Sequence, residues 1–261
     1  MDKTPLLQAI KITKAFGGLT AVDSVDMSVY PGSIVSLIGP NGSGKTTLLN
    51  LFSGIYTPTS GDVFFRQSRI NNLMPHIIAK RGMSRTFQTI KVFPELTVQA
   101  NVMIGFHCKK RSNAFSMIVG TKTARHEESE VKDKAASIVS FVGLEGKQHS
   151  LAGSLPYGQK KLVEIARALI SSPFLLLLDE PAAGMNLAEK ENLIELVSRI
   201  ASKGTSIILV EHDMNVAMTL ADRVMVLNFG KKIAEGSTSE IQRNPKVIES
   251  YLGQRVQYAE D

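Results

Sequence analysis

The fold of this 261-residue chain can be inferred from Ser33-Ile-Val-Ser-Leu-Ile38 and the Gly39-Pro-Asn-Gly-Ser-Gly-Lys45-Thr46 that follows it. The first part is a short apolar run with the length of a buried strand. The second part matches GxxxxGKT, a glycine-rich loop whose backbone N–H groups hold phosphate. A helical pattern over about 44–52 comes next. Strand, loop and helix in this order are the setting that the motif requires, so the sequence predicts a nucleotide site here.

The residues of this loop have separate predicted roles. Glycines allow the backbone N–H groups to turn inward as an anion-binding nest. Lys45 adds a cation at the outer phosphates, and the Thr46 hydroxyl can bind Mg²⁺. The predicted nucleotide-binding residues of the loop are Gly39, Pro40, Asn41, Gly42, Ser43, Gly44, Lys45, Thr46 and Thr47. These residues alone are compatible with a kinase, a GTPase or an ATPase.

A second apolar run ends in two carboxylates, Phe174-Leu-Leu-Leu-Leu-Asp179-Glu180. Ligands of open parallel sheets bind beyond the carboxyl ends of the strands, where this pair is expected to lie. Asp179 is the predicted partner of Mg²⁺. Glu180, one residue further, can polarise a water that attacks the terminal phosphate. An acidic pair at a strand end is weak evidence alone, but with the phosphate loop it indicates nucleotide hydrolysis.

The remaining pattern indicates an α/β core with an insertion. Further buried strands are predicted at 205–210 and 223–227, and the latter leads through a hairpin turn into 232–235. An amphipathic helix between the strands has a predicted apolar face of Leu193, Ile194, Leu196, Val197 and Ile200. Residues 89–157 differ, because they are helical, charged and free of strand-like apolar runs. We therefore predict a helical subdomain inserted into a core whose sheet is mostly parallel.

Composition restricts the class of protein. Cys108 is the only cysteine, so no internal disulfide can form, and we expect no chemistry from it. No run of about 18 apolar residues is present, and the first residues do not resemble a signal peptide. The formal net charge of +6 suits an anionic partner. Basic clusters lie at 109–111 and 122–134, and acidic residues at 127, 128 and 130 interrupt the second. This pattern favours a solvated helix face, so no nucleic acid is expected.

A third motif carries a family resemblance. Leu155-Pro-Tyr-Gly-Gln159, followed by a helical pattern, resembles the LSGGQ signature of ABC-type ATPases. Six elements occur in the order of that family: the phosphate loop, Gln88, the signature, Asp179-Glu180-Pro181, the following loop and His212. The resemblance implies a P-loop NTPase core of the ABC type with an antiparallel β subdomain. The implied division is an α/β core at 6–88 and 158–235, a helical subdomain at 89–157 and a C-terminal helix and tail at 236–261.

Further site residues follow from the resemblance, which implies ATP or ADP and Mg²⁺ as cofactors. Phe16 resembles the aromatic residue that stacks on adenine, although core packing is the alternative. Gln88 resembles the residue that senses Mg²⁺ and the attacking water, and His212 the histidine that contacts the γ-phosphate. The implied catalytic residues are thus Glu180, His212 and Gln88, and the metal site consists of Thr46, Gln88 and Asp179. Tyr157, Gly158 and Gln159 would bind the ATP of a partner subunit.

Two residues depart from the family pattern. Pro156 stands where the signature has serine, so no hydroxyl is available for the γ-phosphate. Asn186 stands where the loop after the acidic pair usually has aspartate, and communication across a dimer could differ as a result. A chain with such a signature could work best beside a different ATPase that completes the second site.

The same departures indicate a branch of the family. LxYGQ, Glu-Pro-Ala-Ala-Gly-Met-Asn, Phe16-Gly-Gly18 and the Tyr251-Leu-Gly253 ending resemble ATPase subunits of branched-chain amino-acid importers. The resemblance implies two membrane permeases, a second ABC ATPase or another copy of this chain, and indirectly a solute-binding protein. It implies a peripheral position on the cytoplasmic face of the inner membrane. An exporter of lipid or polysaccharide and a stand-alone ATPase of iron–sulfur assembly are the alternatives.

The segment after Gln88 is the expected docking region for a permease. Val92, Phe93, Pro94 and Leu96 would form the apolar lip of a groove. The alternative is that these four residues only anchor the helical subdomain.

Overall fold

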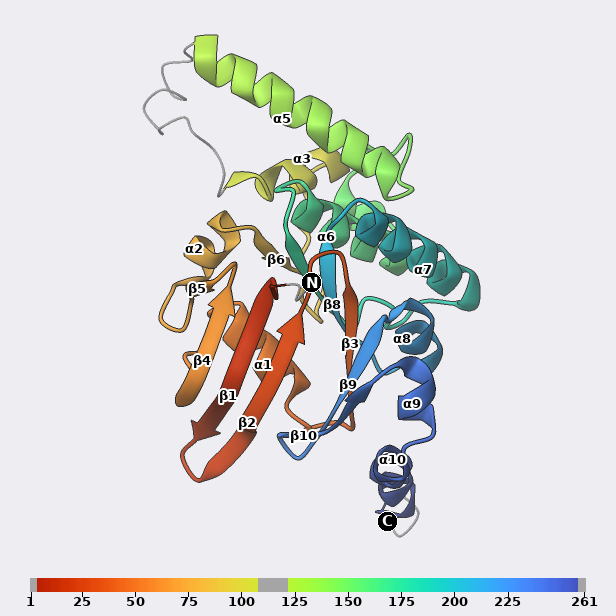
Figure 1. Cartoon of the computed structure of the whole chain (residues 1–261). Coiled ribbons are helices and arrows are strands. Elements are labelled where there is room, and N and C mark those ends of the chain that lie inside the picture. Colours follow the sequence, from red (N-terminus) through yellow and green to blue (C-terminus); the bar gives the residue numbers. More distant parts are fainter. Residues whose placement is uncertain (1–3, 108–121, 258–261) are drawn as a thin grey trace.

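The computed structural model describes residues 4–107 and 122–257, which form two sheets and a helical layer (Figure 1). Cys108 and the basic cluster at 109–111 lie outside the described residues. The antiparallel sheet lies on the left of Figure 1, and helices α3 and α5 lie at the top. The predicted combination of an α/β core, an antiparallel sheet and helices between core segments is confirmed.

The central sheet has six strands in the order β10-β9-β3-β8-β7-β6. All neighbouring pairs are parallel except β9 with β10, which form the predicted hairpin. The strand bounds are β3 Ile34–Ile38, β6 Met83–Arg85, β7 Leu175–Asp179, β8 Ser206–Val210, β9 Arg223–Asn228 and β10 Lys231–Gly236. Every residue of β3, β7 and β8 is buried, as expected for strands covered on both faces.

The central sheet separates two hydrophobic cores. Side chains alternate across a strand, so Leu176 and Leu178 of β7 enter one core and Leu175 and Leu177 the other. The first core is shared with α3 (Val98–Ile104), α5 (Lys122–Phe141), α6 (Tyr157–Leu169) and α7 (Leu187–Ser202). The second is shared with α1 (Lys45–Phe52), α2 (Pro75–Lys80) and the antiparallel sheet.

The antiparallel sheet has the order β2-β1-β4-β5. Its strands are β1 Leu7–Phe16, β2 Leu19–Val29, β4 Ser60–Phe65 and β5 Ser68–Arg69. In β1, Leu7, Ala9 and Ile12 are buried, and a register shift between Ala9 and Ile12 breaks the strict alternation. This sheet packs against α1 in the second core and so holds in place the helix that follows the phosphate loop.

The helical layer has a wider extent than the predicted insertion. The described part of 89–157 contains α3, α5 and the 3-10 helix Ala152–Ser154, while α6 begins at Tyr157 and packs against α3 and α5. The boundaries at 88 and 158 stay a prediction. The predicted apolar face of α7 is confirmed at Leu193, Leu196, Val197 and Ile200.

Three helices of the C-terminal part lie on the right of Figure 1; the first contacts α7 and β3, and the other two contact β10. They are α8 (Met214–Leu220), α9 (Thr238–Gln242) and α10 (Pro245–Gln257). Within the described ranges, no helix is both long enough and apolar enough to cross a membrane.

Candidate functional site

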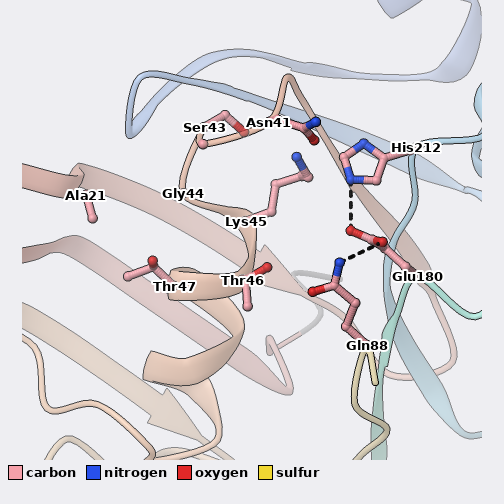
Figure 2. A pocket seen from close by; sticks show the side chains of 11 residues that line it. Ala21, Asn41, Ser43, Gly44, Lys45, Thr46, Thr47, Gln88, Glu180 and His212 are labelled. Atoms are coloured by element: carbon pink, nitrogen blue, oxygen red, sulfur yellow. Dashed lines mark hydrogen bonds and ion pairs between the residues drawn. The ribbon is translucent and has the colours of Figure 1, made fainter. Parts of the chain in front are cut away.

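A cavity of about 730 Å³ lies at the carboxyl ends of the parallel strands (Figure 2). Its walls come mainly from the loop between β3 and α1, the first residues of α1, and the segments after β6, β7 and β8. The lining residues are Ala21, Asn41, Gly42, Ser43, Gly44, Lys45, Thr46, Thr47, Gln88, Glu180 and His212. Residues predicted from four separate stretches of sequence are therefore brought to one cavity, as parallel sheets arrange their ligand sites.

The glycines of the phosphate loop are required by its backbone. Gly42 and Gly44 have φ of 75° and 102°, which side chains disfavour. A Cβ at Gly44 would lie 2.4 Å from the Ala21 carbonyl oxygen, so the loop packs against β2 too closely for any other residue. Gly44 is also the N-cap of α1 and supplies no side-chain cap. The first N–H groups of α1 are thus left for an anion in the cavity.

The Lys45 side chain is hydrogen-bonded to the backbone of the phosphate loop. Its ammonium donates to the carbonyl oxygens of Gly39 at 2.7 Å and Pro40 at 2.8 Å. Burial lowers the pKa of Lys45, while the charges of Glu180 and Asp179 oppose this shift. Ser43 adds a buried hydroxyl without a hydrogen-bond partner among the described residues. The cavity therefore offers the cation, a hydroxyl and the N–H groups that a polyphosphate needs.

Glu180 joins the predicted catalytic residues. Gln88 Nε2 donates to Glu180 Oε2 at 3.0 Å, and His212 Nε2 shares a hydrogen bond of 2.8 Å with Glu180 Oε1 (Figure 2). The backbone of Glu180 has a φ of 49°, a conformation that costs about 1–3 kcal/mol for such a residue. A carboxylate that is held by two polar side chains beside a phosphate loop, on a strained backbone, fits a general base.

Asp179 is not among the residues that line the cavity. Its side chain is 1% exposed, and Oδ2 accepts a hydrogen bond of 2.9 Å from Arg85. Arg85 also donates to Asn50 at 2.6 Å and Ser53 at 3.0 Å on the far end of α1. The sequence did not assign Arg85 a role, although a buried strand-end aspartate needs a cation nearby.

The predicted Mg²⁺ ligands are suited to this ion. Thr46 and Gln88 line the cavity, and Asp179 Oδ1 is buried without a hydrogen-bond partner among the described residues. Mg²⁺ prefers oxygen ligands such as hydroxyl, amide and carboxylate groups. The donor set therefore fits the metal.

Six predicted nucleotide-binding residues do not line the cavity. Gly39 and Pro40 belong to the phosphate loop, where their carbonyls accept from Lys45. The other four lie outside the loop. The Phe16 ring is 42% exposed and packs edge-on against Tyr56, with centroids 5.2 Å apart. Tyr157 lies beside Gly184, where a Cβ would be 2.9 Å from its ring. Gly158 is similarly close to Glu189, and Gln159 accepts a hydrogen bond of 2.9 Å from Lys147. The roles of these four residues stay predictions.

The departures at Pro156 and Asn186 have structural roles at helix ends. Pro156 is the N-cap of α6 and provides no side-chain cap. Asn186 is the N-cap of α7, where its Oδ1 accepts from Glu189 N at 3.0 Å and Glu189 Oε2 accepts from Asn186 N at 2.9 Å. Asparagine is as effective as aspartate in such a capping box, so α7 loses no stability through this departure.

Tyr251 connects the C-terminal helix to the phosphate loop. It packs against a cluster that contains Ile38, the last residue of β3. Burial raises the pKa of Tyr251 to about 12, and a hydrogen bond with the Gly39 backbone opposes the rise. The sequence marked the Tyr251-Leu-Gly253 ending only by resemblance, because contact between residues 212 apart leaves no local signal.

Comparison with known proteins agrees with this geometry. The family model described as "ABC transporter" matches residues 22–183, and "Branched-chain amino acid ATP-binding cassette transporter" matches residues 231–256. The high-affinity branched-chain amino acid transport ATP-binding protein LivG of Escherichia coli K12 is 41% identical over 251 residues, covering 96% of this chain and 98% of the relative.

Two solved structures extend the comparison. An ATP-binding cassette of an ABC transporter in its ADP conformation has a TM-score of 0.84 and 34% identity, covering 96% of this chain and 100% of that one. A dimeric ATP-binding cassette in a post-hydrolysis state, bound to ADP and Pi, has a TM-score of 0.75 and 26% identity, covering 89% and 98%. The chain therefore belongs to the ABC transporter family, as a subunit that binds and hydrolyses ATP to power transport.

Proposed function

We propose that this chain energises an importer of branched-chain or other hydrophobic amino acids by hydrolysing MgATP. The observation that carries the ATPase part is Glu180, which is held between Gln88 and His212 at a cavity that also contains Lys45. The relative from Escherichia coli, which is named for branched-chain amino acid transport, supports the choice of solute.

In the proposed mechanism, the phosphate loop and Lys45 bind the β- and γ-phosphates. Lys45 exchanges its bonds with the Gly39 and Pro40 carbonyls for phosphate oxygens. Glu180 accepts a proton from the water that attacks the γ-phosphorus, while the bond to the ADP oxygen breaks. Gln88 orients this water, and His212 holds Glu180 and contacts the γ-phosphate.

Thr46, Gln88 and Asp179 would hold Mg²⁺, which neutralises phosphate charge when bound. Arg85 keeps Asp179 in place through their ion pair of 2.9 Å. Both groups of this pair are buried, so the carboxylate has little freedom to turn away.

The second subunit of the proposed dimer is another ABC ATPase or a second copy of this chain. Tyr157, Gly158 and Gln159 begin α6, whose first N–H groups have no side-chain cap. They do not line the cavity of their own chain, although a helix N-terminus suits an anion. In the proposed dimer they face the γ-phosphate of the partner, and the dimeric relative bound to ADP and Pi supports such an assembly.

The missing signature hydroxyl gives a first prediction. Pro156→Ser should raise the ATPase activity of the isolated chain on the order of threefold, since a new hydrogen bond is worth about 0.5–1.5 kcal/mol. The serine also caps α6, so the free energy of unfolding should rise by about 1 kcal/mol. Phosphate release and urea unfolding measure the two effects. Pro31→Ser, on an exposed turn before β3, is the matched control. Unchanged activity would mean that backbone N–H groups alone make the contact.

The proposed permease site is a groove of about 450 Å³ between α2, the segment after β6 and α3. Phe93 lines this groove and is 47% exposed. The other apolar residues of its lining include Ile55, Ile78, Met83, Phe87 and Ile104. Val92 instead packs onto the helical core, and Leu96 lines a separate cavity beside α3 and α5. Three of the four residues predicted as one lip, Val92, Phe93 and Leu96, therefore lie in three different places.

Phe93→Ala should lower the amount of permease that co-purifies with the chain about tenfold, because an exposed aromatic anchor often dominates an interface. The ATPase activity of the isolated chain should stay unchanged. Phe174→Ala provides the control, since Phe174 is 46% exposed but lies outside this groove. Equal permease recovery with both variants would exclude the groove as the docking site.

The importer itself is tested by purification from the native cell. The tagged chain is extracted from gently solubilised membranes, and its partners are identified by mass spectrometry. Two polytopic permeases and a second ABC ATPase would support the proposal and a peripheral position on the cytoplasmic face of the inner membrane. Recovery of a soluble scaffold, as in iron–sulfur assembly, or of no membrane protein would contradict it.

A further inference from the structure

Glu211 is a buried carboxylate that the mechanism above does not use. Glu211 lies between the end of β8 and His212, and it is only 3% exposed. Glutamate is rarely buried to this extent without a partner. None of the ion pairs found among residues 4–107 and 122–257 includes Glu211. Its partners are backbone N–H groups instead.

These N–H groups come from the two segments that carry the catalytic pair. Glu211 Oε1 accepts a hydrogen bond of 2.7 Å from Ala182 N, two residues after Glu180. Glu211 Oε2 accepts one of 3.2 Å from His212 N. The carboxylate therefore joins the segment that follows Glu180 to the segment that contains His212, and these two side chains are in contact at 2.8 Å.

The segment after β7 needs such a restraint. Glu180 has a φ of 49°, and strained backbone persists only where surrounding contacts hold it. Glu180 N donates to Val210 O at 2.9 Å, which fixes the near side of the turn. The bond from Ala182 to Glu211 fixes the far side. Glu180 is thus held on both sides by consecutive residues at the end of β8.

The histidine loop is also fixed beyond His212. Asp213 caps α8 by accepting from Asn215 N at 3.0 Å and Val216 N at 3.2 Å. Its other oxygen pairs with Lys190 of α7 at 2.7 Å. With Glu211 on one side and Asp213 on the other, the backbone of His212 has little freedom, and its ring is directed to Glu180.

The geometry points to Glu211 as a positioning residue that sets the distance and orientation between Glu180 and His212 during ATP hydrolysis. This inference rests on the proposed roles of those two residues. Burial raises the pKa of Glu211 to about 7, the N–H groups oppose the rise, and the charge of Glu180 adds to it. The protein keeps an unfavourable carboxylate where an apolar residue could not join the two segments.

Glu211→Gln tests this role because it keeps the size of the side chain. Its amide oxygen can still accept from Ala182 N, but its NH₂ group opposes the N–H of His212. Glu211→Asp keeps the charge but is one methylene too short to reach both segments. Each variant should lower kcat, up to about 100-fold for a displacement near 1 Å, with KM for ATP within about twofold of wild type.

Asp222→Asn is the matched control, since Asp222 Oδ2 accepts from Ile34 N at 2.8 Å at the opposite end of the sheet. It should leave kcat unchanged. Glu180→Gln, assayed alongside, distinguishes the two levels of the proposal. Unchanged ATPase activity of the Glu180→Gln variant would exclude Glu180 as the general base. Loss with Glu180→Gln but wild-type kcat in both Glu211 variants would overturn the positioning role alone.

Thermal melting separates positioning from a purely structural effect. Melting curves of both variants give the folded fraction at the assay temperature, and kcat is calculated per folded molecule. A drop in kcat that persists after this correction supports the inference. A drop that disappears with it, or that is matched by an equal loss of ATP affinity, contradicts it.

Discussion

Changing Glu180 to Gln is expected to abolish ATP turnover while ATP binding stays within about twofold of wild type. The amide keeps the size of the side chain and can still hydrogen-bond to Gln88 and His212, but it cannot take a proton from the attacking water. General-base catalysis contributes about 10²–10⁴-fold, so kcat should fall by at least this amount. Phosphate release measures turnover, and calorimetric titration with ATP measures affinity.

The same variant should accumulate as an ATP-bound dimer with its partner ATPase, because the charge that bridges the two subunits is not removed. Size-exclusion chromatography with and without ATP detects this species. Glu191→Gln, on the exposed face of α7, is the control and should behave as wild type. Wild-type turnover in the Glu180 variant would remove this residue from the proposed mechanism.

Changing Lys45 to Ala is expected to abolish measurable ATP binding. A lysine about 4 Å from a phosphate charge contributes roughly 4 kcal/mol at an effective dielectric near 20, before desolvation is subtracted. Burial already lowers the pKa of this ammonium, so part of its desolvation cost is met in the folded chain. We therefore expect affinity to fall at least about 100-fold, as 1.4 kcal/mol corresponds to tenfold.

Calorimetric titration of the Lys45 variant with ATP checks this prediction. Lys80→Ala, at the exposed end of α2, removes the same charge outside the cavity and should bind ATP normally. An affinity within twofold of wild type for Lys45→Ala would mean that the loop N–H groups bind the phosphates without the cation.

The strands could be predicted because short apolar runs in the sequence indicate buried strands. Residues 174–178 are a continuous apolar run, and 205–210 end in four apolar residues. The structure has β7 one residue later at both ends and β8 one residue later at its start. Asp179 itself belongs to β7, since the last residue of a buried strand can be polar when a cation such as Arg85 faces it. The phosphate loop was equally local, because its glycines and Lys45 are contiguous.

The contacts that complete the site could not be predicted in this way. Glu211 hydrogen-bonds to Ala182, and Arg85 joins α1 to Asp179. These partners are far apart in the sequence, and the periodicity of a helix or strand does not indicate such contacts. The sequence also gave no indication that Phe93 and Leu96 line different cavities, since neighbouring residues in a loop can point to different sides. Tertiary packing, rather than local propensity, determines these contacts.

Solute uptake into proteoliposomes tests the central claim most directly. The purified complex, with its solute-binding protein, is assembled with either the wild-type chain or the Glu180→Gln variant, and labelled leucine uptake is measured with ATP. We predict uptake that requires ATP and disappears with the variant. Leucine uptake that is equal with both chains, or absent although the wild-type complex hydrolyses ATP, would contradict the account.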